Sequence, residues 1–144
     1  MGNEGRSPCP INLAVEILGD KWSLVVLRDI MFADRRHFRD LLQSSEEGIA
    51  SNILAARLQA LVDHGLVTRT DDPAHKQRVI YNLTESAIQL LPLMIQLGAW
   101  GTRHTPSAPE FGLRFETLEN KGPQLWDQLM NELRRRHLDQ ASAR

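Results

Sequence analysis

Residues 48–83 read GIASNILAARLQALVDHGLVTRTDDPAHKQRVIYNL, and this stretch decides the fold. Its leucines recur at helical spacing as far as Gly65, which predicts a helix with one apolar side and a narrow, polar opposite side. Two short extended runs follow, at 66–70 and 79–83, and the second alternates as a half-buried strand does. A basic turn containing Pro73 joins them. We expect a helix followed directly by a β-hairpin with a cationic tip.

Three helical patterns precede this stretch. The first follows Pro10 and stops at Gly19. The second covers residues 21–32, with Asp20 as its expected N-cap, and apolar residues wrap most of its circumference. We expect this second helix to be central and buried on several sides. Residues 37–45 predict a third, brief helix.

An apolar helix is predicted after the hairpin. Thr84 is its expected N-cap, it spans about residues 85–104, and Pro92 is expected to kink it. A helix that is apolar on almost every side needs a partner outside a compact domain. The chain therefore divides into a first domain, 1–104, and a linker with a helical extension, 105–144.

The composition is that of an ordinary globular protein. The 144 residues are 42% hydrophobic and 24% charged, with a net charge of −1, so affinity for nucleic acid must come from a local patch. No apolar run reaches the ~20 residues that a membrane helix requires. The single cysteine, Cys9, excludes an internal disulfide, and the first residues lack the apolar run of a signal peptide. We expect a cytoplasmic protein without a membrane partner.

The sequence predicts no enzyme, no metal site and no cofactor. It lacks a phosphate-binding glycine loop, a nucleophile elbow and a zinc-protease motif. The histidines have no ligand spacing and no cysteine companions; they stand at positions 37, 64, 75, 104 and 137. Three tryptophans could line a ligand cavity, but their apolar helical positions favour packing; they are Trp22, Trp100 and Trp126.

The order of these elements resembles the HxlR-type winged helix-turn-helix transcription regulators of bacteria, which are MarR-like. The matching stretches are CPINLAVEILGDKWSLVVLRDI, RRHFRDLL, EGIASNILAARLQALVDHGLV, RVIYNLTE and LLPLMIQLGAWGTRH. The resemblance runs from Cys9 to about His104 and does not cover the extension. It implies a mainly α fold with a small β-hairpin (α+β), in which a winged helix-turn-helix domain carries a long dimerisation helix.

The resemblance also implies homodimers that bind palindromic operators in double-stranded DNA and repress or activate neighbouring genes, with repressor as the working role. It makes residues 51–64 the recognition helix and 67–83 the wing. Asn52 and Gln59 lie on the exposed side of that helix, where their amides could hydrogen-bond base edges or phosphates. The full set of candidate DNA contacts is Arg36, Ser51, Asn52, Ala55, Ala56, Arg57, Gln59, Lys76 and Arg78.

Each polar candidate has a structural alternative. Asn52 could cap the helix beside Ser51, and Gln59 could simply be solvated. Arg57 could form an ion pair inside the helix-turn-helix instead of reaching a phosphate. The alternative for Lys76 and Arg78 is a soluble hairpin tip, and for Arg36 it is a charged turn before the third helix.

Cys9 and the apolar helix complete the expected sites. In several relatives of this family the N-terminal cysteine is a redox or electrophile sensor, and Cys9 stands at the matching position. A helix N-terminus could lower the pKa of its thiol, whereas the alternative is a small packed side chain. The expected dimerisation residues on the apolar helix are Leu91, Met94, Ile95, Gly98 and Trp100.

Two further alternatives stay open from sequence. The extension could pack on the partner subunit, enclose a pocket for a small-molecule effector, or enlarge the dimer interface. The alternative function is a winged-helix protein–protein interaction module without direct DNA binding, which the acidic net charge allows.

Overall fold

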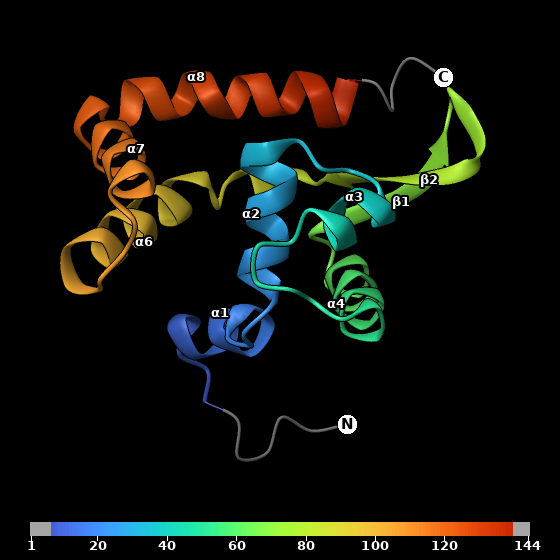
Figure 1. Ribbon diagram of the computed structural model, residues 1–144, viewed down its shortest axis with the longest axis horizontal. Helices are drawn as coiled ribbons and strands as arrows, with labels where there is room; N and C mark the ends of the chain where they lie inside the picture. The colour runs from blue at the N-terminus through green and yellow to red at the C-terminus, as the bar shows by residue number, and fades with distance from the viewer. Residues whose placement is uncertain (1–6, 140–144) are drawn as a thin grey trace.

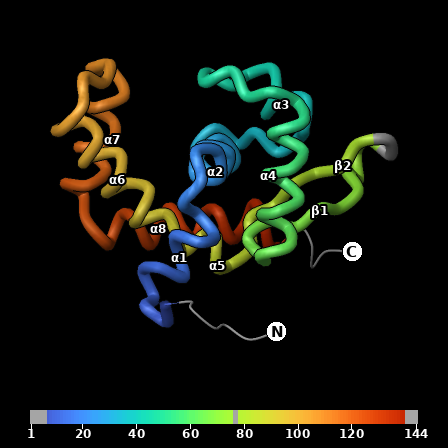
Figure 2. Tube along the Cα trace, turned by 90° about the horizontal axis from the view of Figure 1, so that it is seen from below, coloured from blue at the N-terminus to red at the C-terminus, as the bar shows by residue number. Residues whose placement is uncertain are grey.

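The computed structural model describes residues 7–139, apart from the side chains of residues 76 and 77 (Figure 1). The elements in chain order are α1 (Pro10–Leu18), α2 (Ser23–Ala33), α3 (Phe38–Gln43), α4 (Ser51–Asp63), β1 (Val67–Asp72), β2 (His75–Leu83), α5 (Glu85–Ile88), α6 (Leu91–His104), α7 (Pro109–Lys121), α8 (Pro123–Arg134) and a π-helical turn, η1 (Arg135–Asp139). The fold is mainly helical with a two-stranded antiparallel hairpin, which confirms the predicted winged helix-turn-helix class. The pair α6 and α7 lies at one end of the molecule, and α4 with the hairpin lies at the other (Figures 1 and 2).

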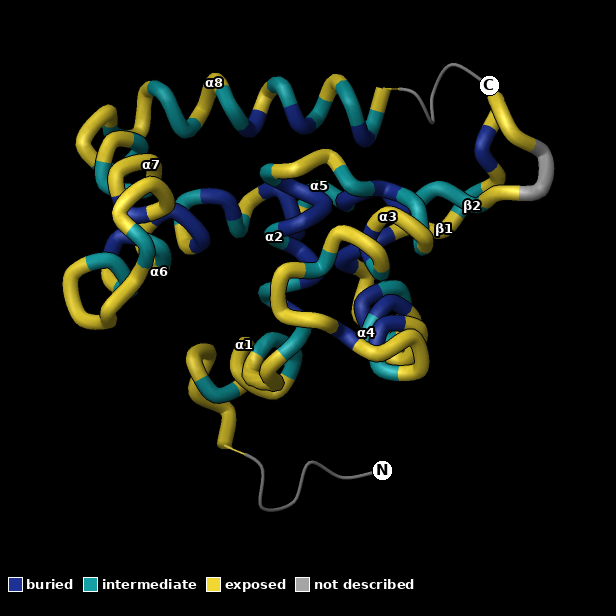
Figure 3. The backbone as a smooth tube through the Cα atoms, viewed as in Figure 1, coloured by how far each residue is buried: buried dark blue, intermediate teal, exposed yellow. Residues whose placement is uncertain are grey.

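The second helix, α2, stands at the centre of the core. Val26, Leu27 and Ile30 are at most 2% exposed, because apolar residues wrap this helix as the sequence predicted. Three leucines of α4 belong to the same buried cluster; they are Leu54, Leu58 and Leu61. Figure 3 shows how this packing leaves the opposite side of α4 open. Burial of the leucine side therefore fixes which residues α4 presents to solvent.

Three local signals act at or near the residues that the sequence predicted. The Asp20 carboxylate accepts hydrogen bonds from the backbone N–H groups of Trp22 and Ser23, at 2.8 and 2.9 Å, and so bonds the start of α2, although Trp22 and not Asp20 occupies the N-cap position. Gly65 takes a positive φ of 74°, which lets the chain turn sharply from α4 into β1. The Thr84 hydroxyl accepts from the Ala87 N–H and caps the helix after the hairpin.

The hairpin is anchored at its base and projects at its tip. Val67 lies opposite Leu83, and both are buried in the core. The pairing shifts between Asp71 and Asp72, and an irregularity of this kind bends a hairpin. The wing therefore extends away from the helices while its first pair stays fixed (Figure 2).

The helix expected over residues 85–104 is two helices. α5 ends at Ile88 and α6 begins at Leu91, with Pro92 in its first turn. Proline is favoured there because the backbone N–H that it lacks has no partner at a helix start. Pro92 thus begins a helix, and the expectation that it kinks one is wrong.

The extension begins with α7, which packs closely along α6. A Cβ atom on Gly98 of α6 would lie 2.5 Å from the ring of Phe115 in α7. A Cβ atom on Gly112 of α7 would likewise lie 2.6 Å from Thr102. Glycine at these two positions therefore permits the close approach of the two helices.

The last elements, α8 and η1, cross back from α7 toward the base of the hairpin (Figure 1). Met130 and Leu133 join the main buried cluster. His137 of η1 is 1% exposed, and its Nδ1 accepts a hydrogen bond of 3.1 Å from the Leu83 N–H at the end of β2. The C-terminal part of the chain thus contacts the strand that forms the wing.

Candidate nucleic-acid interface

The open side of α4 carries small and polar side chains. Ser51, Asn52, Ala55, Ala56 and Gln59 are all exposed. The N-cap position of α4 is occupied by Ala50 without a side-chain cap, so neither Ser51 nor Asn52 caps this helix. Within residues 7–139 the side chains of Ser51 and Asn52 have no hydrogen-bond partner, so both remain available to an external ligand. The structure therefore brings these five predicted residues together on one accessible surface.

Two candidate residues of α4 have intramolecular partners. The Gln59 amide donates to Asp63 one turn later at 2.9 Å, on the exposed side. Arg57 forms an ion pair with Asp20 at 3.4 Å, and Asp20 also bonds the start of α2. Arg57 therefore forms an intramolecular ion pair, but its partner Asp20 precedes α2 and lies outside the helix-turn-helix of α3 and α4. Its guanidinium ties α4 to the start of α2, and a third of its side chain stays exposed.

The wing supplies exposed cations beside α3. Arg78 of β2 is exposed, while the side chain of Lys76 lies outside the described part of the structure. Arg78 and Arg39 line the same hollow of about 310 Å³, together with His37, Phe38 and Val79. Arg39 was not among the predicted contacts, because its place beside the wing depends on a contact almost forty residues away. Arg69 of β1 is a second exposed cation that was not among the predicted contacts.

Arg36 is buried, so the expectation that it contacts DNA is wrong. Its guanidinium donates to the side-chain oxygen of Asn82 and, at 3.0 Å, to the backbone carbonyl of Arg136. Burial lowers the pKa of Arg36. The RRH turn looks like a surface segment in sequence, but its second arginine points inward because the C-terminal turn covers it.

His37 fixes the position of the wing relative to α3. Its Nε2 lies 2.7 Å from a carboxylate oxygen of Asp72, at the end of β1. Asp72 also accepts a hydrogen bond from the Ala74 N–H at 2.9 Å, inside the turn. The Ala74 N–H and the His37 ring hold the pKa of Asp72 below its ordinary value. These contacts join the hairpin turn to the helix that precedes α4.

Cys9 lies at the start of α1 and is exposed. The backbone N–H groups of Asn12 and Ile11 lower the pKa of its thiol. This is the direction that a helix N-terminus produces, since its free N–H groups favour the thiolate. Because Cys9 is exposed, the alternative that it packs as a small apolar side chain is wrong.

The expected dimerisation residues are placed differently from the prediction. Leu91, Met94 and Ile95 are buried within this chain, and Gly98 lies against Phe115. Leu91 and Ile95 are closed off by packing within this chain, whereas Met94 and Gly98 line a hollow beside the exposed Leu97. Trp100 is 58% exposed. Other exposed apolar side chains lie on α6 and α1; they are Leu93, Leu97, Ile11, Leu13 and Val15.

Other kinds of site find no support in residues 7–139. No three histidine, cysteine, aspartate or glutamate side chains there are grouped closely enough to hold a metal ion. None of the helices in that range combines the length and the apolar character needed to span a bilayer. The predicted DNA contacts that stay exposed lie on α4 and the wing.

Comparison with known proteins gives the family. Residues 17–109 match the family described as HxlR-like helix-turn-helix. An HTH-type transcriptional regulator of Mycobacterium tuberculosis is 34% identical over 125 residues, covering 85% of this chain and 75% of the relative. Another, from Synechocystis, is 33% identical over 94 residues, covering 65% of this chain and 68% of the relative.

Solved structures agree with these sequence matches. PA1607, described as a candidate transcription factor, has a TM-score of 0.65 at 31% identity, over 75% of this chain and 72% of that chain. The reduced transcriptional regulator YodB from B. subtilis gives 0.57 at 26%, over 69% and 97%. The redox regulator HypR in its oxidised form gives 0.57 at 25%, over 69% and 100%. Since the family match spans more than half of the sequence, the chain belongs to the HxlR-like helix-turn-helix family of DNA-binding transcriptional regulators, which are not enzymes.

Proposed function

We propose that the protein binds palindromic operator DNA in the cytoplasm as a homodimer, with α4 in the major groove and the wing on the flanking backbone or minor groove. The observation that carries this proposal is the open side of α4. Its leucine side is packed in the core, whereas Asn52, Ala55, Ala56 and Gln59 have no covering element. A major groove admits a helix whose outer side chains are this small.

The exposed side chains suit different parts of a recognition site. The Asn52 amide can pair with the edge of an adenine, and Ala55 and Ala56 can contact a thymine methyl group. Arg39 and Arg78 line one hollow and can neutralise phosphates beside the helix. Arg57 is paired with Asp20, so it acts first by holding α4 against α2. Base contacts from α4 would then determine which DNA sequence is preferred, and phosphate contacts from the wing would add affinity.

Dimerisation would use the apolar side chains that this chain leaves exposed. Val15 of α1 is 55% exposed, and Leu97 and Trp100 of α6 are 45% and 58% exposed. Large apolar side chains left this exposed are candidates for a partner surface. Two linked recognition helices bind a palindrome far more tightly than one, because the second binding step is intramolecular. A dimer therefore compensates for the few cations near one α4.

A footprint on the DNA that flanks the gene tests the DNA proposal. We expect two protected half-sites about one helical turn apart, or a multiple of it, with affinity that falls steeply as salt rises. The measurement is repeated on a shuffled sequence of the same length. Equal affinity for both sequences, or no dependence on salt, would contradict the proposal and favour a protein-docking module.

Sedimentation of surface variants tests the dimer. Trp100→Glu replaces an exposed apolar side chain of the proposed interface with a charge and should give monomers. Leu113→Glu, on α7, is the matched control because Leu113 is 72% exposed and lies outside α1 and α6. Dimerisation that survives Trp100→Glu, or that Leu113→Glu also abolishes, would place the interface elsewhere.

We also propose that Cys9 modification or a small effector modulates DNA binding. Cys9 supports the first route because its thiol is exposed and its pKa is lowered. A single cysteine per chain can form a disulfide only between subunits, or it can react with a small electrophile. Cys9→Ser should make operator binding insensitive to diamide or to a quinone. A response that persists in this variant would remove Cys9 from the proposal.

A further inference from the structure

The outer edge of β2, which does not pair with β1, is covered by two other parts of the chain. The Tyr81 N–H donates to the backbone carbonyl of Arg36 at 2.8 Å, and the Leu83 N–H donates to Nδ1 of His137 at 3.1 Å. N–H groups two residues apart on a strand point to the same edge, so both bonds lie on one side of the hairpin. This edge is therefore bonded both to the segment before α3 and to η1.

Arg36 connects these two covering segments to each other. Its guanidinium donates to the side-chain oxygen of Asn82 in β2 and, at 3.0 Å, to the backbone carbonyl of Arg136 in η1. The residue is buried, and a buried charged group is costly to detach from its hydrogen-bond partners. Movement of β2 away from η1 would break these bonds together.

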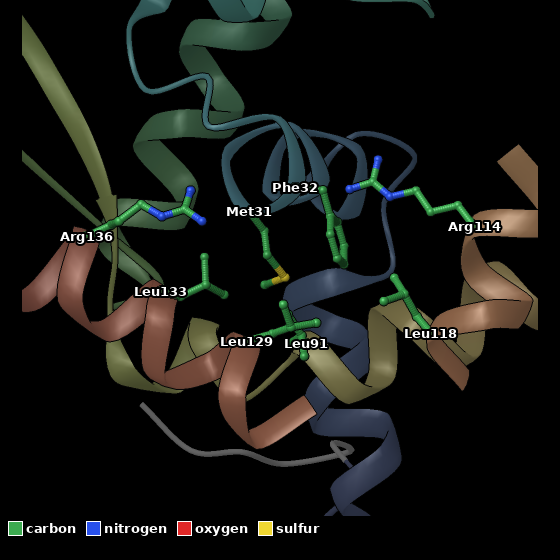
Figure 4. Close-up of a pocket in the computed structure, with 8 residues that line it drawn as sticks. All are labelled: Met31, Phe32, Leu91, Arg114, Leu118, Leu129, Leu133 and Arg136. Carbon is green, nitrogen blue, oxygen red and sulfur yellow. The ribbon is translucent and has the colours of Figure 1, made fainter. Parts of the chain in front are cut away.

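The C-terminal side of this contact is fixed to the core. Figure 4 shows Leu133 of α8 directed toward Met31 and Leu91, and all three line one pocket. At the end of α8, Arg134 donates two hydrogen bonds of 2.8 Å to the carboxylate of Glu85, at the start of α5. η1 therefore continues from a helix that is held on both sides, and it can act as a fixed support for the hairpin.

The angle of β2 at its base decides where Arg78 lies. At ~3.3 Å per residue, the strand from Leu83 back to Arg78 is about 17 Å long, so a tilt of about 10° at the base would displace Arg78 by about 3 Å. A displacement of that size breaks a hydrogen bond to a phosphate. A two-stranded hairpin is only marginally stable by itself, so its angle depends on the groups that hold its base.

We propose that η1 holds β2 at the angle at which Arg78 reaches DNA, with His137 as a positioning residue and Arg36 as the link. The residues that match the family end at 109, whereas η1 begins at Arg135, so this support lies outside the family match. The effect on DNA rests on the proposed function. The hold on the hairpin does not, and it can be measured without DNA.

Amide hydrogen exchange of the full chain without DNA measures the hold on the hairpin. His137→Leu removes the acceptor of the Leu83 N–H. It also removes Nε2 of His137, which is buried without a partner among the described residues, so one unpaired group replaces another and the fold should persist. His137→Gln keeps an acceptor at this place.

We expect His137→Leu to speed exchange in β1 and β2 at least about fivefold, with α2 unchanged. His137→Gln should stay near the parental rates. Unchanged exchange in the hairpin would overturn the proposal. An equal increase in α2 would also overturn it, because it would show a loss of stability throughout the fold.

Binding to a labelled duplex of mixed sequence, about three helical turns long, measures the effect on DNA. His137→Leu should weaken binding about threefold and lower the slope of log affinity against log salt by up to about 1, because Arg78 loses its phosphate. His137→Gln should bind as the parent does. Met130→Ala is the control for packing, since Met130 is buried in α8 and its loss leaves both bonds to β2 in place. It should lower stability without changing the slope.

A double-mutant cycle separates positioning from a general loss of stability. The loss caused by His137→Leu should shrink in an Arg78→Ala background, where the displaced contact is already absent, and stay the same in an Asn52→Ala background. Equal losses in both backgrounds, or parental affinity and slope in His137→Leu, would overturn the proposal. A parent protein that does not bind the duplex would contradict the proposed function and with it the role of η1 in DNA binding, while the exchange measurement would still decide whether η1 holds the hairpin.

Discussion

The exposed side of α4 and the buried contact between the hairpin and the C-terminal turn differ in whether their polar groups are bonded within the chain. On α4, Asn52 is exposed and has no partner among the described residues. On the other side of the wing, Arg36, Asn82 and His137 are buried, and each takes part in a hydrogen bond within the chain. Burying a polar group is costly unless it bonds within the fold, whereas an exposed group can bond a ligand. Arg36 Nε and His137 Nε2 are nevertheless buried without a partner among the described residues. We therefore expect α4 to recognise DNA and the C-terminal turn to hold the hairpin in place.

Truncation of a buried and of an exposed leucine in the extension should give the largest difference in the free energy of unfolding. Leu133 is 3% exposed, and Leu133→Ala should lower the free energy of unfolding by about 2–5 kcal/mol, because it leaves a cavity in the core. Leu113 is 72% exposed, and Leu113→Ala should change the same quantity by less than about 0.5 kcal/mol. Urea denaturation of both variants provides the measurement. Similar small losses would mean that the extension is only loosely attached.

The buried His137 should make stability depend on pH. Burial, with the charges of Arg36 and Arg136, lowers the pKa of His137 to about 3 from an ordinary value of 6.5. Between these values the unfolded chain binds a proton that the folded chain does not, so stability is lost as pH falls through 6.5. A protonated Nδ1 could no longer accept the Leu83 N–H.

This linkage should remove about 2 kcal/mol from the free energy of unfolding between pH 7 and pH 5. Denaturation of the parent and of His137→Gln, at both pH values, isolates the effect, because glutamine can still accept a hydrogen bond but does not titrate. The variant should lack this part of the pH dependence. An identical dependence in both proteins would show that His137 is not the group responsible.

Asn52 should affect sequence preference and leave the fold unchanged. Asn52→Ala should weaken binding by about 1–3 kcal/mol, mainly at one base pair of each half-site, with an unchanged free energy of unfolding. Asn120→Ala, an exposed asparagine near the end of α7, is the matched control. Equal losses on operator and shuffled DNA would remove Asn52 from base recognition.

Arg78 should give the smallest and least specific effect. Arg78→Ala should weaken binding to all DNA sequences alike and lower the slope of log affinity against log salt by about 1. Lys121→Ala removes a cation outside the proposed interface and should leave the slope unchanged. A loss confined to the operator would instead make Arg78 a base contact.

The sequence predicted what depends on local signals. The leucine spacing of α4, the turn at Gly65 and the cap at Thr84 each involve neighbours within a few residues, and all were correct. Asp20 does bond the start of α2, but it stands two residues before the N-cap position. The break before Pro92 was misread because proline both kinks helices and begins them.

The sequence could not predict contacts made across the fold. Arg36 and His137 look like surface residues in polar segments, yet Arg36 bonds Asn82 and Arg136, 46 and 100 residues away. Leu91 and Ile95 read as dimer contacts because nothing in the sequence says that the extension will cover them. For the same reason Arg39 was missed, since only the folded hairpin brings Arg78 beside it.

Amide hydrogen exchange with and without operator DNA tests the central assignment most directly, since it reports on both surfaces in one experiment. We expect slower exchange on DNA binding at residues 51–64 and in the wing, and unchanged exchange in α8. Protection that appears in α8 while residues 51–64 stay unchanged would contradict it.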